Sequence, residues 1–280
     1  AKITAFQENS EIPLLVGIDE EGGTVSRLNS NSRLIDYIFQ SPRDLYAKGG
    51  LEAVSEDTVN KCALLNGYGI NVNFAPVCDI SEKNGDYMYQ RSLGENPEVT
   101  ADYVSTVVGI MNEYRVGSVL KHFPGYGSNG DTHKSVMRDS RDYDEFKQRD
   151  FVPFIAGMEA GAGCVLVSHN IVECMDADVP ASLSPEVHRV LRDELGFDGV
   201  IITDDLSMDG VLDFMDNSEA AVQAVLAGND MIIATYYQEQ YSAVLKACRE
   251  GRISEDRLND SVRRVLIWKQ SLGLSIYNSD

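Results

Sequence analysis

A glycine-rich segment, residues 121–133, carries the side chains best suited to proton transfer. It follows the apolar run 116–120, contains three glycines and ends with Asp131 and His133. Glycine lets a loop bend freely, and histidine, with an unperturbed pKa of about 6.5, can give and take a proton near neutral pH. An Asp two residues away can orient the ring and raise its basicity. The spacing therefore predicts a general acid/base on a loop that can approach a bound ligand.

Two adjacent carboxylates, Asp204 and Asp205, stand at the end of the apolar run 200–203. Neighbouring residues of a strand point in opposite directions, so only one of them can easily face the interior. A carboxylate placed there can act as a nucleophile, a base or a metal ligand. The alternative is structural, with one Asp capping the next helix and the other paired with a buried arginine.

A further acidic segment, residues 17–27, combines Asp19 with a Gly-Gly pair that permits a tight turn near a ligand. It is not a phosphate loop, because it is acidic and lacks the G-x-x-x-x-G-K-[ST] pattern. A carboxylate can accept two hydroxyl hydrogen bonds. This segment therefore favours recognition of a neutral hydroxylated ligand such as a sugar.

A metal site was weighed against these readings. Asp131, His133 and Asp204 could together ligate zinc, but no H-E-x-x-H or other clustered pattern supports it. Lys121, immediately before His122, also argues against a cation. We expect neither a metal nor a cofactor.

The composition limits the class of protein. With 280 residues and 43% hydrophobic content, the chain can bury a sizeable core. The absence of a Pro- or Ser-rich linker favours a single domain over residues 1–280. A net charge of -20 argues against nucleic acid and anionic membranes as partners. No apolar run reaches the roughly 18 residues of a membrane helix, so we expect no membrane insertion.

The compartment is predicted less directly. No signal peptide is visible, which favours the cytoplasm. The chain starts at Ala1 without an initiator Met, so a secreted or cell-surface location is the alternative. Five scattered cysteines without a C-x-x-C pair indicate reduced thiols. The oligomeric state is not predicted.

These residues must be positioned by alternating strands and helices. Apolar runs predict strands at 14–18, 70–75, 116–120, 164–168, 200–203 and 231–235, with a weaker candidate near 35–39. Amphipathic patterns predict helices at 51–66, 97–114, 142–160, 185–195, 218–227, 238–250 and 254–272, the fourth and last with Ser184 and Ser254 as N-caps. Such alternation implies a parallel sheet.

The position of the polar residues favours one type of parallel sheet. Asp19, Lys121, His169 and Asp204 follow four different predicted strands. In a (β/α)8 TIM barrel those positions converge on the C-terminal face, where active sites lie. We therefore predict a barrel, although seven strands are found where eight are needed. A doubly wound open sheet is the alternative.

Taken together, these motifs resemble family 3 glycoside hydrolases, in particular the bacterial β-N-acetylglucosaminidase (β-N-acetylhexosaminidase) branch. The matching segments cover nearly the whole chain in the family's order: 19–23 with Arg27, 73–79, 91–94, 121–125, 131–133, 168–169, 180–184, 196–208 and 251–258.

The resemblance implies a (β/α)8 barrel and a retaining mechanism. Asp204 would be the nucleophile and Asp205 its structural neighbour. His133, supported by Asp131, would be the acid/base. The residues that would bind the sugar are Asp19, Arg27, Arg91, Lys121 and His122.

The chain departs from the family pattern in two places. Tyr126 stands where the family often has His. The family's first strand normally precedes the helix leading into Pro13, and few residues precede it here. We therefore expect either a longer chain upstream or an incomplete barrel.

The resemblance implies an exo-acting β-N-acetylglucosaminidase that acts on small carbohydrates derived from peptidoglycan or chitin, with water or phosphate as acceptor. A β-glucosidase of the same family is the alternative, and the Asp131-x-His133 loop argues against it. A non-catalytic sugar-binding protein and a metal-dependent hydrolase are the remaining classes.

Overall fold

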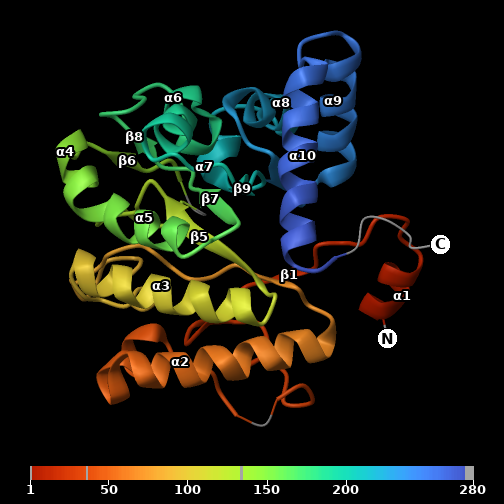
Figure 1. Ribbon diagram of the computed structural model, residues 1–280. Coiled ribbons are helices and arrows are strands. Elements are labelled where there is room, and N and C mark those ends of the chain that lie inside the picture. The colour runs from red at the N-terminus through yellow and green to blue at the C-terminus, as the bar shows by residue number, and fades with distance from the viewer. Residues whose placement is uncertain (1, 36, 133–134, 275–280) are drawn as a thin grey trace.

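The computed structural model describes residues 2–35, 37–132 and 135–274 (Figure 1). A six-stranded sheet forms its centre, in the order β1-β4-β5-β7-β9-β10, and every pair in it is parallel. Its strands are β1 (Gly17–Ile18), β4 (Val72–Asn73), β5 (Gly117–Phe123), β7 (Cys164–Val167), β9 (Val200–Asp205) and β10 (Met231–Ile233). All residues of β5 and β7 are buried, as expected for parallel strands covered on both faces.

Two small sheets accompany the central one. β2 (Glu20–Gly22) and β3 (Val25–Ser26) form an antiparallel hairpin directly after β1. β6 (Arg138–Asp139) pairs with β8 (Ile171–Val172) in parallel. Both small sheets therefore belong to connections that leave the C-terminal ends of central strands.

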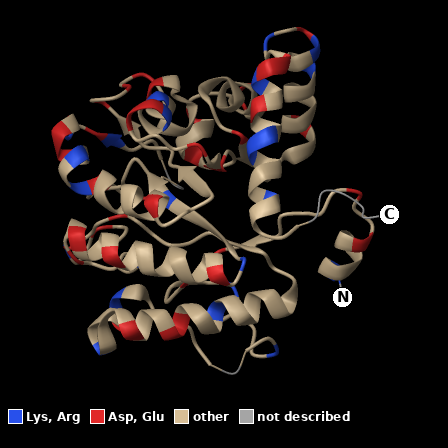
Figure 2. Ribbon diagram, viewed as in Figure 1, with Lys and Arg blue, Asp and Glu red and all other residues tan. Residues whose placement is uncertain are grey.

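Helices pack outside the sheet, and successive helices contact each other: α2 with α3, α3 with α5, and α8 with α9. Charged residues of both signs are spread along these helices (Figure 2). The helices are α1 (Lys2–Glu8), α2 (Pro42–Tyr68), α3 (Pro97–Glu113), α4 (Tyr143–Glu145), α5 (Phe151–Glu159), α6 (Pro185–Arg189), α7 (Asp209–Leu212), α8 (Asn217–Ala227), α9 (Tyr237–Arg249) and α10 (Glu255–Ser271). Within the described ranges, no helix is long and apolar enough to cross a membrane.

The six clear strands are confirmed, and the doubly wound alternative is wrong. A doubly wound sheet reverses its strand order at a switch point, whereas this order follows the chain from one edge to the other. The sheet is a parallel, curled α/β sheet. Over the described residues β1 and β10 do not pair with each other, so the predicted eight-stranded barrel is seen only in part.

The weaker strand prediction near 35–39 is wrong for residues 35 and 37–39, which form no strand. Phe39 is buried in the main core, and this burial produced the apolar signal. Its N–H donates to the side chain of Asn29 at 3.0 Å, and its carbonyl accepts from Gly23 at 2.9 Å. The backbone is thus satisfied without a ladder of strand hydrogen bonds.

The seven predicted helices are present, and both predicted N-caps are confirmed. The hydroxyl of Ser184 accepts from Val187 N and that of Ser254 accepts from Arg257 N, each at 3.2 Å. Two predicted helices, 142–160 and 185–195, contain single π-helical turns at Phe146–Asp150 and Val190–Glu194. In α2, non-helical dihedrals at Gly49 and Gly50 mark a kink, just before the predicted start at residue 51.

The inner face of the sheet is closed at its N-terminal end by α10. Trp268 and Leu272 pack there with Val72, Val119 and Leu166. A Cβ on Gly163 would lie 2.2 Å from the indole nitrogen of Trp268, so only glycine admits the ring. The opposite end, where the strands terminate, is left for the polar residues.

Candidate active site

A cavity of about 350 Å³ opens at the C-terminal ends of the strands, a size suited to a small-molecule ligand. It brings together all five predicted sugar-binding residues and Asp204, from segments up to 185 residues apart in sequence (19 to 204). The lining side chains are Asp19, Val25, Arg27, Phe74, Tyr87, Arg91, Lys121, His122, Tyr126, Leu166, Asp204, Asp205 and Ile233.

A buried carboxylate, Glu21, organises the cations on one wall. Its Oε1 lies 2.6 Å from Lys121 Nζ and 2.7 Å from Arg91 Nη2, and its Oε2 accepts from Arg91 Nε at 2.9 Å. Burial raises the pKa of Glu21, but Lys121 and Arg91 outweigh it and lower the pKa to about 2. Glu21 therefore stays ionised and holds both cations in place. Glu21 belongs to a segment that resembles the family, but its role was not predicted from the sequence.

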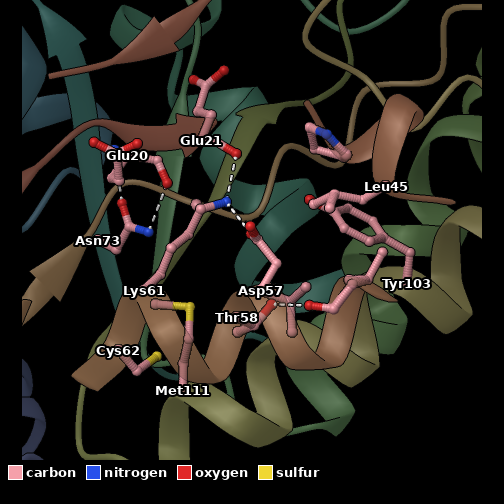
Figure 3. A pocket seen from close by; sticks show the side chains of 14 residues that line it. Glu20, Glu21, Leu45, Asp57, Thr58, Lys61, Cys62, Asn73, Tyr103 and Met111 are labelled. Atoms are coloured by element: carbon pink, nitrogen blue, oxygen red, sulfur yellow. Dashed lines mark hydrogen bonds and ion pairs between the residues drawn. The ribbon is translucent and has the colours of Figure 1, made fainter. Parts of the chain in front are cut away.

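The backbone of Glu21 is held from below by a buried ion pair (Figure 3). Lys61, on α2, donates to the Glu21 carbonyl at 3.1 Å and lies 2.7 Å from Asp57 Oδ2. A Cβ on Gly22 would lie 2.1 Å from the Gln40 carbonyl oxygen, so the hairpin approaches the chain too closely for a larger residue. The helix thus fixes the β2–β3 hairpin that carries the site.

Asp19 faces the cavity with its carboxylate partly exposed. Its Oδ1 accepts from Lys121 Nζ at 2.9 Å, and its Oδ2 lies 3.6 Å from Arg27 Nη2. Arg27 is 64% exposed and lies at the rim. The carboxylate keeps capacity for further hydrogen bonds from ligand hydroxyls.

His122 is fixed by Asp79, which was not predicted as a site residue. Asp79 Oδ2 accepts from the backbone N–H of His122 at 3.1 Å and lies 2.7 Å from its Nδ1. On the other side of the ring, Nε2 lies 3.2 Å from Arg91 Nη2. Arginine can only donate, so Nε2 accepts and the proton of the neutral ring lies on Nδ1. Asp79 Oδ1 also accepts from Tyr126 N at 2.8 Å and so ties the following loop to the same carboxylate.

Asp204 and Asp205 have different surroundings at the end of β9. Asp204 Oδ1 accepts from the N–H of Asp205 at 2.8 Å. The Asp205 carboxylate accepts from Ser207 N at 2.8 Å and from the Thr235 hydroxyl, and is therefore occupied by the protein. In the described part of the chain, Asp204 Oδ2 has no hydrogen-bond partner. Asp204 is thus the carboxylate available to a ligand.

The groups around Asp204 keep its carboxylate ionised. Burial raises its pKa, but the nearby His169, His122 and Lys121, together with the Asp205 N–H, outweigh burial and lower the pKa below its ordinary value. An ionised carboxylate at this place suits a nucleophile. The alternative pairing of one Asp with a buried arginine is not seen among the described residues.

The glycine-rich loop returns to the cavity at Asp131. Its carboxylate hydrogen-bonds the hydroxyl of Tyr87, a cavity residue, and together with burial this raises the pKa of Tyr87. Next to it, the Thr132 hydroxyl bonds Tyr126, and the Thr132 carbonyl accepts from Gly210 N at 3.1 Å. His133 lies outside the described residues, so its predicted role stays a prediction. Over the described residues, no group of three or more His, Cys, Asp or Glu side chains could hold a metal ion.

Comparisons with known proteins identify the family of this chain. The family model described as the glycosyl hydrolase family 3 N terminal domain matches residues 2–267. Beta-hexosaminidase A of Pseudoalteromonas piscicida is 32% identical, covering 98% of this chain and 51% of that protein. A beta-hexosaminidase of Hydrogenovibrio crunogenus is 31% identical, covering 79% of this chain and 62% of that protein.

Solved structures give the same result. A glycoside hydrolase family 3 beta-N-acetylglucosaminidase from Paenibacillus sp. str. FPU-7 superposes with a TM-score of 0.89 at 33% identity, covering 100% of this chain and 55% of that one. A beta-N-acetylhexosaminidase from Beutenbergia cavernae superposes with a TM-score of 0.83 at 29% identity, covering 92% of this chain and 79% of that one. The chain thus spans about half the length of the first relative of each kind.

Proposed function

Because this chain belongs to glycosyl hydrolase family 3, whose N-terminal domain it matches over residues 2–267, we propose that it is a retaining, exo-acting β-N-acetylglucosaminidase. It removes terminal β-linked N-acetylglucosamine from fragments derived from peptidoglycan or chitin. The names of its beta-hexosaminidase relatives support the substrate class.

The observation that carries the proposal is the ionised carboxylate of Asp204 at the end of β9. A retaining glycosidase needs an anionic nucleophile that attacks the anomeric carbon and a separate group that protonates the leaving oxygen. Asp204 is held by its own strand, and its Oδ2 has no hydrogen-bond partner among the described residues, which suits in-line attack. The covalent glycosyl-enzyme is then hydrolysed by water in the second step.

The second group is His133, supported by Asp131. As imidazolium it protonates the departing sugar oxygen, and as neutral imidazole it then takes a proton from water. The hydrogen bond between Asp131 and Tyr87, a residue that lines the cavity, supports this role, because it brings the part of the loop before His133 near the cavity. A neutral base repels an incoming anion less than a carboxylate does, so phosphate can replace water as acceptor.

Sugar hydroxyls are bound by the ion network on the opposite wall. Asp19 accepts from two neighbouring hydroxyls, while Lys121, Arg91 and His122 surround the ring oxygens. Because the Glu21 carboxylate already neutralises Lys121 and Arg91 in part, the wall suits a neutral sugar better than an anionic one.

The experiment compares release of nitrophenol from the β-N-acetylglucosaminide and from the β-glucoside. We expect a much higher kcat/KM for the N-acetylglucosaminide. Equal rates, or a preference for the glucoside, would favour the β-glucosidase alternative, and no turnover of either would favour a sugar-binding protein. Adding phosphate tests the acceptor, because a phosphorolytic enzyme yields the sugar 1-phosphate.

We also propose that the sheet is part of a (β/α)8 barrel. The unreversed strand order and the parallel pairing support it, as do the outer edges of β1 and β10, which have no partner strand among the described residues. An apolar cavity of about 640 Å³ beside β10, lined by Met231, Ile232, Tyr241 and Leu258 among others, gives room for a covering element. In a closed barrel, the edge amides of β10 in the native protein should be protected from hydrogen exchange, whereas rapid exchange would contradict closure.

A further inference from the structure

His169 lies just beyond the end of β7 and is fully buried, so it cannot touch a bound sugar. Its Nε2 lies 3.0 Å from the carbonyl oxygen of Asp205. A carbonyl only accepts hydrogen bonds, so Nε2 carries the proton and donates. On the other side of the ring, Nδ1 lies 2.7 Å from the hydroxyl of Ser182. The ring therefore bridges β9 and the segment that carries Ser182.

Asp205, the residue that His169 binds, also contacts the Asp204 carboxylate. Its N–H donates to Asp204 Oδ1 at 2.8 Å, and its carboxylate is occupied by Ser207 N and the Thr235 hydroxyl. With its carbonyl bound by His169, the polar groups of Asp205 are fixed on all sides. A shift of the Asp205 backbone would turn the Asp204 carboxylate, because the Asp205 N–H holds Asp204 Oδ1.

Ser182 is itself held rigidly. Its N–H donates to the Ser168 carbonyl at 2.9 Å, and its carbonyl accepts from Asn229 Nδ2 at 2.7 Å. A hydroxyl can donate to a neutral ring or accept from a protonated one. His169 therefore keeps both of its hydrogen bonds in either protonation state.

We propose that His169, held by Ser182, is a positioning residue that fixes the backbone of Asp205 and thereby aims the Asp204 carboxylate at the anomeric carbon. This inference rests on the proposed function, in which Asp204 is the nucleophile. It also gives a role to residues 168–169 and 180–184, two of the segments through which the sequence resembles the family.

The electrostatic surroundings of Asp204 agree with this role. Within the described ranges, titratable groups near its carboxylate come from β5 (Lys121 and His122), from the loop after β5 (Tyr126), from β9 (Asp205) and from the end of β7 (His169). Among the groups that lower the pKa of Asp204 against the effect of burial, His169 has the largest effect. Removing the ring should therefore raise the pKa of Asp204 as well as release its orientation.

The experiment uses three variants and a dinitrophenyl β-N-acetylglucosaminide, whose leaving group needs no proton. His169→Leu removes both ring hydrogen bonds. His169→Gln keeps an N–H that can reach the Asp205 carbonyl, but loses the titrating ring. Ser182→Ala leaves the ring and removes its support. Val108→Ala is the control for lost stability, because it leaves a cavity in the core under α3, away from the site.

We expect His169→Leu to slow formation of the glycosyl-enzyme about 100-fold, the cost of a misplaced reacting group. The acid limb of its kcat/KM profile should move to higher pH, because a larger share of Asp204 is protonated. The affinity for free N-acetylglucosamine should not change, since the ring does not touch the sugar. His169→Gln should restore most of the rate, and Ser182→Ala should fall between the two. Val108→Ala should change only stability.

The inference is overturned if a fluorinated sugar labels Asp204 of the wild-type enzyme, labels His169→Leu equally fast, and the acid limb of the kcat/KM profile is the same for both enzymes. If His169→Leu does not fold, the same comparison applies to Ser182→Ala and His169→Gln, and two normal profiles would overturn the inference. A wild-type enzyme that is never labelled at Asp204 would instead reject the proposed function.

Discussion

The different hydrogen bonding of Asp204 and Asp205 leads to opposite expectations for two isosteric substitutions. Asp204→Asn should keep the fold but lower kcat by about 10⁴-fold or more, because the nucleophile is lost. Asp205→Asn should cost much less, since an amide still offers one oxygen to Ser207 N or the Thr235 hydroxyl. Steady-state rates with the nitrophenyl substrate measure both. A dead Asp205→Asn beside an active Asp204→Asn would move the nucleophile to Asp205.

His133 gives a second prediction at the residue scale. His133→Ala should form the glycosyl-enzyme from a dinitrophenyl substrate at a near-normal rate, because that leaving group needs no acid. A natural disaccharide should react about 10²–10⁴-fold more slowly than with wild-type enzyme. The second step should stay slow for both and be rescued by azide, which gives the β-azide. Equal slowing for all leaving groups, without azide rescue, would make His133 a positioning residue.

The sequence identified site residues that follow apolar runs, and it missed residues whose roles depend on partners far away in the chain. Asp204, Lys121 and His122 end strong apolar runs, and strand ends converge on one face. Glu21 and Asp79 were not assigned, because their roles depend on contacts with Arg91 and His122 across 70 and 43 residues of sequence. A single sequence contains no signal for such pairs beyond the presence of both charges.

At the scale of elements, the strongest patterns were right, whereas some strand boundaries were not. β5 continues through Lys121 and His122 to Phe123, three residues beyond the predicted end, because buried partners satisfy its polar side chains. The predicted strand near 35–39 failed for the reverse reason: Phe39 is buried but its backbone bonds a side chain. Hydrophobicity reports burial, whereas strand assignment depends on the backbone partner.

The π turn Phe146–Asp150 places a carboxyl under the glycine-rich loop, and this leads to a pH prediction. Asp150 Oδ2 lies 2.7 Å from Arg141 Nη1, while a Cβ on Gly125 would lie 2.3 Å from its Oδ1. Burial raises the pKa of Asp150 to about 6, although Arg141 opposes this. The folded state therefore retains a proton that the unfolded chain loses. The associated stability is complete below the ordinary pKa of 3.8 and is lost as the pH rises through about 6.

Asp150→Asn resembles the protonated form at every pH. The variant should therefore be more stable than the wild type at pH 8, by up to about 3 kcal/mol, and similar to it at low pH. Urea unfolding across this pH range measures the difference. If Asp150→Asn were less stable than wild type at pH 8, attraction to Arg141 would outweigh burial, and the assigned direction would be wrong.

At the scale of the whole molecule, the two ends of the sheet have separate tasks. The C-terminal ends carry the ion network and Asp204. The N-terminal ends are packed by Trp268 of α10 against Gly117 and Gly163. Because the strands between them are buried and rigid, a packing defect at the N-terminal end should reduce stability without changing the geometry of the site.

Gly163→Ala tests this separation. The new Cβ would meet the Trp268 indole at 2.2 Å and force the ring or α10 to move, which should cost about 1–3 kcal/mol of unfolding free energy. Gly67→Ala is the matched control, because it adds the same methyl group in α2 with no atom within 4 Å. It should leave stability unchanged or raise it by up to about 1 kcal/mol, since alanine favours the helix. Both variants should keep the wild-type kcat and KM at a temperature where they are folded. A folded Gly163→Ala with an altered KM for the N-acetylglucosaminide would show that α10 and the site are coupled through the strands.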